Sequence, residues 1–230
     1  MTARPETAKP PRSGGFARTL PVHRCRINTN WKTSGTANVI VIRRHTNGNF
    51  TYAAYLVDLL CLGVKDTYYN FNRFPDELEN LLDDSESETE MMDIDYLLAH
   101  NIIYAGHDFA TDYHIPQHPD FINITRYLLE EDDEKIALVD VHTGDENGMP
   151  HLVVTSSNRE PTALARLKGY AGEGHYRYTV LQGEPFMEKD FDDDWEDVET
   201  DDDFDEEGLE DEDEEDPDFR TILDCAVKSP

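Results

Sequence analysis

The sequence predicts a single α+β domain with a mostly antiparallel sheet and packed helices. Three observations point to this class. Two apolar, β-rich runs flank the turn dipeptide Asn47-Gly48, an apolar stripe with helical spacing lies within residues 93–112, and strands and helices do not alternate regularly. Strands come first, helices follow, and two strands, a helix and a strand complete the domain, an order typical of α+β proteins.

The first element is a β-hairpin with strands at about 38–44 and 49–58. Asn47-Gly48 readily takes the positive φ angles of a type I′ turn, which predicts a two-residue loop. The predicted cross-strand pairs are Ile42 with Ala53, Ile40 with Tyr55, and Val39 with Leu56. Both strands are apolar on both faces at their far ends, so we expect them at the centre of a covered sheet.

A third short strand is expected at 67–72, entered through Gly63, and this glycine indicates a bulge or a close backbone approach. Pro75 opens a short acidic helix to about Leu82, and the polar residues 83–90 predict an exposed loop.

A longer helix is expected over about 93–112. Its apolar stripe consists of Leu98, Ile102, Ala105 and Phe109. The motif His118-Pro119-Asp120 then predicts a second helix to about Glu130, with proline at the first helical position.

The last part of the domain is predicted to hold a second hairpin, a helix and a strand. In the hairpin, Ile136–Val141 faces Leu152–Val154 across a glycine-containing loop. The helix is expected near 161–168 and the final strand near 175–182.

Composition divides the chain into four parts: a disordered leader at 1–19, the α+β domain at 20–187, a disordered polyacidic tail at 188–218 and a short C-terminal segment at 219–230. The tail holds 22 acidic residues and one base, Lys189. Like charges at this density repel and cannot bury enough apolar surface to offset the entropy of ordering.

The net charge of −30 disfavours binding to nucleic acid or to an anionic membrane. The exception is the N-terminal arm, where bases could contact phosphates and Trp31 could stack on a base; the bases are Arg4, Lys9, Arg12, Arg18, Arg24 and Arg26. The alternative is an arm that is solvated or pairs with the protein's own acids.

Three unpaired cysteines, no apolar secretory signal and no membrane-span run favour a cytoplasmic protein.

One candidate catalytic cluster lies where a strand leaves the sheet, and it consists of Asp58, Cys61, Lys65 and Asp66. A cysteine beside a lysine can act as a nucleophile of lowered pKa. The alternative is that Cys61 is a small buried hydrophobic residue and Lys65-Asp66 a surface pair.

A candidate metal site consists of His114, His118 and Asp120, with help from Asp108 or Asp112. Mixed histidine and carboxylate ligands suit zinc, manganese or iron, and such a site activates water for hydrolysis. The alternative is that Asp120 complements the positive end of a helix and the histidines line a polar face. Apart from this divalent metal, no cofactor is predicted.

The common signatures of nucleotide-binding loops, of serine hydrolases with a GxSxG motif and of CxxC zinc sites are absent from the sequence. The acidic tail instead carries apolar residues that are candidate partner-binding anchors: Phe191, Trp195, Phe204 and Leu209. Acidic segments with interspersed aromatics dock on basic, partly apolar grooves. A tail that only solubilises the domain, or that covers it, is the alternative.

These observations favour a non-enzymatic cytoplasmic interaction or regulatory protein, whose acidic tail engages a basic partner or shields a basic surface. The alternative from another class is a metal-dependent hydrolase or nuclease that uses the histidine and aspartate site. A third hypothesis is a structural subunit of a larger assembly.

Three blocks carry a family resemblance: AAYLVDLLCLGVKD (53–66), IIYAGHDFATDYHIPQHPDF (102–121) and EEDDEKIALVDVHTGDENGMP (130–150). Residues 23–155 thereby resemble an uncharacterised bacterial family that pairs a YLVDLLCLGVKD block with a downstream GF-x-PH-x-DF block and an FG-x-x-GKP turn. The chain departs from this pattern at His114–His118 and at Asn147–Pro150. No activity is established for the family, so the resemblance implies a shared fold and no mechanism.

Overall fold

The computed structural model of the chain describes residues 17–133, 135–155 and 160–181. The N-terminal residues 1–16, the acidic run 188–218 and the segment 219–230 lie outside the described residues. The helices and strands are β1 (Val22–Asn28), α2 (Trp31–Ser34), β2 (Thr36–Arg44), β3 (Phe50–Asp58), β4 (Gly63–Arg73), α3 (Pro75–Glu88), β5 (Met91–Ile94), α4 (Tyr96–Asp112), α5 (Pro119–Asn123), η1 (Thr125–Leu128), β6 (His151–Thr155), α6 (Pro161–Tyr170) and β7 (Arg177–Leu181).

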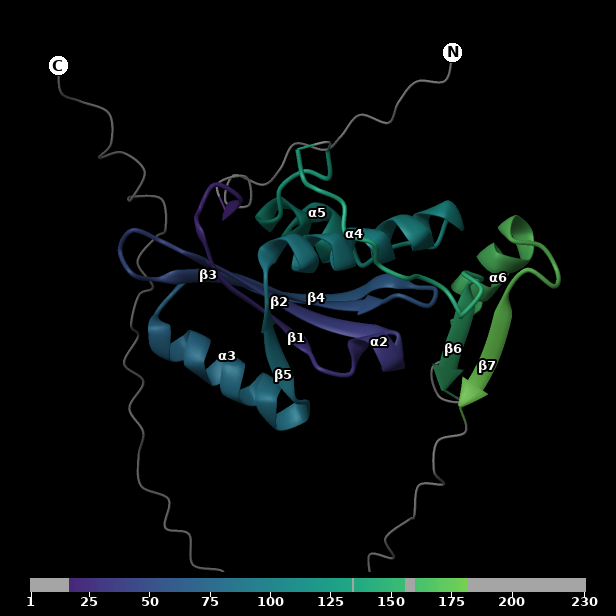
Figure 1. Ribbon diagram of the computed structural model, residues 1–230, viewed down its shortest axis with the longest axis horizontal. Coiled ribbons are helices and arrows are strands. Elements are labelled where there is room, and N and C mark those ends of the chain that lie inside the picture. The colour runs from purple at the N-terminus through teal and green to yellow at the C-terminus, as the bar shows by residue number, and fades with distance from the viewer. Residues whose placement is uncertain (1–16, 134, 156–159, 182–230) are drawn as a thin grey trace, which may run out of the picture. The chain divides into compact units, whose positions relative to one another are not determined.

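The α+β class is confirmed. Five antiparallel strands form one sheet in the order β4-β3-β2-β1-β5, and β6 and β7 form a separate parallel pair. Helix α3 covers one face of the larger sheet, and α4 and α5 cover the other (Figure 1). No helix within the described ranges is long and apolar enough to span a membrane.

The central position of the first hairpin is confirmed, but its predicted register is wrong by one residue. The observed pairs are Ile42 with Tyr52, Ile40 with Ala54, and Val39 with Tyr55. The reason is the loop, which has three residues: the amide of His45 donates to the carbonyl of Asn49 at 2.8 Å, and Gly48 has a φ of 92°. The observed loop is the three-residue type with a glycine at its left-handed position.

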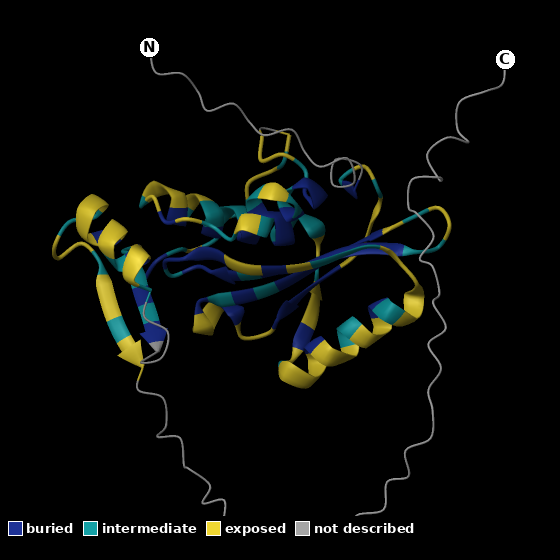
Figure 2. Cartoon of the chain, turned by 180° about the vertical axis from the view of Figure 1, so that it is seen from behind, coloured by how far each residue is buried: buried dark blue, intermediate teal, exposed yellow. Residues whose placement is uncertain are grey.

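This register separates the apolar side chains of the hairpin into two cores. Ala53, Tyr55 and Val57 pack with β1, α4 and α5 on one face. Ile40, Ile42 and Tyr52 pack on the other face against Leu78 of α3 and its neighbours. Figure 2 shows the result: the central strands are largely buried, whereas the outer side of α3 is exposed.

The strand entered through Gly63 is confirmed, and it is longer than predicted. Gly63 has a φ of 68°, and a Cβ at this position would lie 2.4 Å from Oε1 of Gln117. The pairing of β4 with β3 shifts where Lys65 stands between the paired residues Val64 and Asp66. Gly63 therefore permits the expected close approach, and the expected bulge lies two residues further along the strand.

The helix predicted at 75–82 continues to Glu88, so the exposed loop expected at 83–90 is wrong. No glycine or proline interrupts these residues, and Ser85 is buried and donates its hydroxyl to the carbonyl of Leu82 at 2.8 Å. The start of the next helix also differs, because residues 91–94 form β5 beside β1. Helix α4 begins after Asp95, whose carboxylate accepts the amide of Leu98 at 2.7 Å.

The buried face of α4 is rotated relative to the predicted stripe, since of its four residues only Ile102 is buried. The face consists of Ala99, His100, Asn101, Ile102, Ile103, Gly106 and Ala110. The helix expected from 118 to 130 is broken at Ile124, whose φ of −133° is not helical. A short 3₁₀ helix, η1, follows the break.

The second predicted hairpin is wrong. Residues 136–141 form no strand, and β6 instead pairs in parallel with β7, with the confirmed helix α6 between them. The side chain of Asn101 satisfies backbone groups of residues 137–139 that a neighbouring strand would otherwise bind. Its amide group donates to the carbonyl of Ala137 at 3.1 Å and accepts from the amide of Val139 at 2.9 Å.

Candidate functional site

Two of the candidate catalytic residues, Asp58 and Cys61, are buried at the end of β3. The carboxylate of Asp58 accepts the amides of Leu60 and Cys61 at 2.9 and 3.0 Å, which shapes the turn into β4. Burial raises the pKa of Asp58 and raises that of the Cys61 thiol to about 12. A thiol with this pKa stays protonated at neutral pH, so the geometry gives both side chains a structural role.

The other two, Lys65 and Asp66, lie beside His118 in an open cleft of about 720 Å³ between the start of β4 and the 115–119 loop. Nε2 of His118 lies 3.7 Å from a carboxylate oxygen of Asp66. Its Nδ1 accepts the amide of Asp120 at 3.3 Å, so the neutral ring carries its proton on Nε2. An imidazole beside a carboxylate can transfer a proton, yet no hydrogen bond among the described residues joins His118 to a hydroxyl or thiol.

The predicted metal ligands are not brought together. His114 is exposed and stacks on Tyr170 of α6, with ring centroids 3.9 Å apart. His118 caps the start of α5, where its Nδ1 accepts a hydrogen bond from the amide of Asp120. Among the described residues, no three histidine, cysteine, aspartate or glutamate side chains form a group that could hold a metal ion.

Three of the basic residues predicted to contact phosphates pair with carboxylates of the domain instead. Arg18 pairs with Glu131 at 2.9 Å, Arg24 with Asp93 at 2.8 Å, and Arg26 with Glu86. Trp31 is only 6% exposed, so it is not available for stacking on a base. These contacts match the alternative in which the basic residues pair with the protein's own acids. Arg4, Lys9 and Arg12 lie outside the described residues, as do the four tail anchors.

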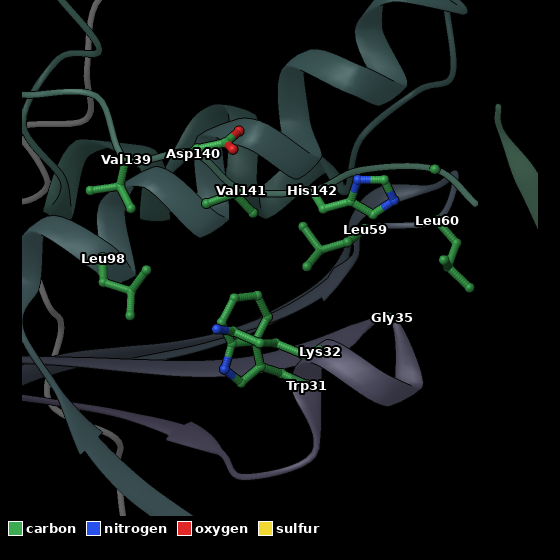
Figure 3. A pocket seen from close by; sticks show the side chains of 11 residues that line it. Trp31, Lys32, Gly35, Leu59, Leu60, Leu98, Val139, Asp140, Val141 and His142 are labelled. Carbon is green, nitrogen blue, oxygen red and sulfur yellow. The ribbon is translucent and has the colours of Figure 1, made fainter. Parts of the chain in front are cut away.

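A second, more enclosed cavity of about 350 Å³ was not found by sequence reasoning. Figure 3 shows Trp31 and Lys32 of α2 on one side of it and Leu98 and Val141 on the other. The rest of the lining consists of Leu59, Leu60, Val139, Asp140, His142 and the glycines at 35 and 144. The lining comes from four separate stretches of the chain, so no local motif marks this site, and the one signal in the sequence is the isolated Trp31-Lys32 pair.

A buried ionic network connects β2 to the loop after η1. Arg43 is 1% exposed, and its guanidinium pairs with Glu130 at 2.7 Å and donates to the hydroxyl of Tyr96 and to the carbonyls of Leu128 and Leu20. The chain thus satisfies this charge internally.

Comparisons with known proteins assign no family: no family model matches the chain, and no match was found among curated proteins or solved structures. The resemblance to the bacterial family therefore stays a prediction.

Proposed function

We propose that this protein is a non-enzymatic cytoplasmic interaction or regulatory protein whose acidic run 188–218 engages a basic partner. The observation that carries the proposal is the charge of that run, with 22 acids against one base. Such a segment attracts a basic surface at long range, and its aromatic residues supply short-range contacts.

The charge arrangement of the described domain supports this proposal. Its arginines at 18, 24, 26 and 43 pair with carboxylates of the domain. Helix α3 and the residues after it add exposed acids, namely Asp76, Glu79, Asp83, Asp84, Glu86, Glu88 and Glu90. The domain therefore presents acidic surface of its own, which favours the same class of partner.

Two of the four candidate catalytic residues give further support. Asp58 is engaged by backbone amides, and the Cys61 thiol is buried and has a raised pKa. Covalent catalysis by this pair would need the turn between β3 and β4 to open.

The test is binding of a short Lys/Arg-rich peptide, followed by affinity capture from the native host's lysate. One variant replaces every Asp and Glu of 188–218 by Asn and Gln. A second keeps all the acids and replaces Phe191, Trp195, Phe204 and Leu209 by alanine. We expect the first variant to lose the peptide and any captured basic protein. The second should keep the peptide and lose the protein, because charge attracts and apolar anchors select.

Salt provides the control. Binding by wild type should weaken steeply between about 0.05 and 0.2 M salt, because exposed charges are screened over a Debye length. Deletion of 188–218 should leave the melting temperature of the domain unchanged. Binding that is insensitive to salt, or that survives the acid-to-amide replacement, would contradict the proposal.

A further inference from the structure

The cavity beside Trp31 has the form of a small-molecule site. Sites of this kind are mostly apolar, have volumes of about 300–1,000 Å³ and carry a few polar groups that orient the ligand. Here the volume is about 350 Å³ and the apolar walls include Leu59, Leu98 and Val141. The exposed parts of the ligand would meet the charged side chains at the edge of the cavity.

Lys32 supplies a cation at this cavity. Its ammonium lies 5.1 Å from the centroid of the Trp31 ring. It takes part in none of the ion pairs that the described residues form. In a chain with a net charge of −30, an ammonium that has no carboxylate partner among the described residues and lies at the edge of an apolar cavity is an available site for an anion.

The other ionisable residues of the lining, Asp140 and His142, are less well placed than Lys32 to contact an anionic ligand. The carboxylate of Asp140 points away from Lys32 (Figure 3). Nε2 of His142 lies 2.7 Å from the backbone carbonyl of Asp145 and donates to it. Lys32 is therefore the charged group of the lining best placed to contact a ligand.

We propose that this cavity binds a small apolar carboxylate, with its apolar body between Leu98 and Leu59 and its carboxylate at Lys32. One ammonium balances one negative charge. A monovalent carboxylate therefore fits better than a phosphate monoester, which carries about −1.5 to −2 at neutral pH.

The experiment reads the fluorescence of Trp31 directly. The chain has two tryptophans, so a Trp195→Phe variant of the full chain leaves Trp31 as the single reporter. This variant is titrated with octanoate, octanol and octylammonium, which share an alkyl chain and differ in head-group charge. Octanoate should change the Trp31 emission with a Kd of about 1 mM or below, which a ligand of this size reaches at modest efficiency. Octanol should bind about two- to fivefold more weakly, the range of a solvent-screened ion pair, and octylammonium more weakly still.

Two variants separate the head group from the cavity. Lys32→Gln, at an exposed position, should reduce octanoate binding to the level of octanol and leave octanol unchanged. Val141→Phe should fill the cavity and remove the response to both octanoate and octanol. Circular dichroism shows whether this variant folds. If it does not fold, the result for Lys32→Gln alone tests the proposal. Equal affinity for the three probes, an octanoate preference that survives Lys32→Gln, or the lack of a saturable response in Trp31 would each overturn the proposal.

Discussion

The buried Arg43–Glu130 pair should make a large contribution to the stability of the domain, and Glu130→Gln tests it. The guanidinium of Arg43 lies 2.7 Å from Glu130 and is almost fully removed from solvent. Replacing the carboxylate by an amide keeps the shape of the side chain and an acceptor, but it leaves the buried cation without a counter-charge. Removing one partner of a buried pair costs about 3–5 kcal/mol, and hydrogen bonds to charged groups contribute about 1.5–3 kcal/mol.

The side chain of Glu130 is 38% exposed, so solvent screens part of the loss. We therefore expect Glu130→Gln to lower the free energy of unfolding by about 2–3 kcal/mol at pH 7, or the melting temperature by about 5–10 °C. Urea unfolding followed by far-UV circular dichroism measures the change. Glu131→Gln is the matched control: this neighbour is 78% exposed and pairs with Arg18, and its loss should cost less than about 1 kcal/mol.

The pH dependence gives an independent check on the same pair. Partial burial opposes ionisation of Glu130, but the hydrogen bond from Tyr96 and the charge of Arg43 outweigh it, and the pKa of Glu130 lies below its ordinary 4.5. A carboxyl with a lowered folded-state pKa stabilises the protein above its unfolded pKa, and this stabilisation is lost as the pH falls through the folded value. The difference between wild type and Glu130→Gln should therefore shrink in acid. If Glu130→Gln and Glu131→Gln were equally stable at pH 7, the assignment of the network as a main support of the fold would be refuted.

Three further predictions concern single positions. Gly63→Ala should destabilise the domain by about 1–3 kcal/mol more than Gly48→Ala in urea unfolding, because both have positive φ but only a Cβ at 63 meets neighbouring atoms; equal losses would contradict the close approach. Asn101→Ala should speed hydrogen exchange at the amide of Val139, which has lost its acceptor; unchanged protection would show that the segment is held by other contacts. In a Cys225→Ser variant at pH 7, Cys61 should resist thiol reagents until the protein unfolds; labelling at the rate of a free thiol would be the contrary result.

Local patterns predicted the elements of this fold that depend on local chemistry. Asn47-Gly48 marked the first hairpin, Gly63 marked the close approach of β4, and helix α6 and strand β7 lie near their expected positions. The register of the hairpin was missed because His45 and Asn49 close the loop, a choice that dipeptide preference alone does not determine.

Elements that depend on distant partners were not predictable in the same way. β5 owes its extended form to pairing with β1, and the 137–139 segment is held by the side chain of Asn101. The candidate sites also differ in whether local sequence or packing between distant segments determines them. Lys65, Asp66 and His118 were singled out from local sequence, and the fold brings them to one cleft. The Trp31 cavity depends on packing between four stretches of the chain, and Trp31 itself was assigned to a nucleic-acid surface because its burial could not be seen.

Charge connects the two proposals. The N-terminal 44 residues hold nine bases and one acid. Four of those bases pair with carboxylates within the fold, namely the arginines at 18, 24, 26 and 43. The cations that balance the acidic run must then come largely from other bases, from the solvent or from a partner, which is the condition for strong, salt-sensitive attraction of a basic protein. Lys32 belongs to the same N-terminal set but has no acid partner among the described residues, and its place beside an apolar cavity gives it the opposite preference, for a small anion.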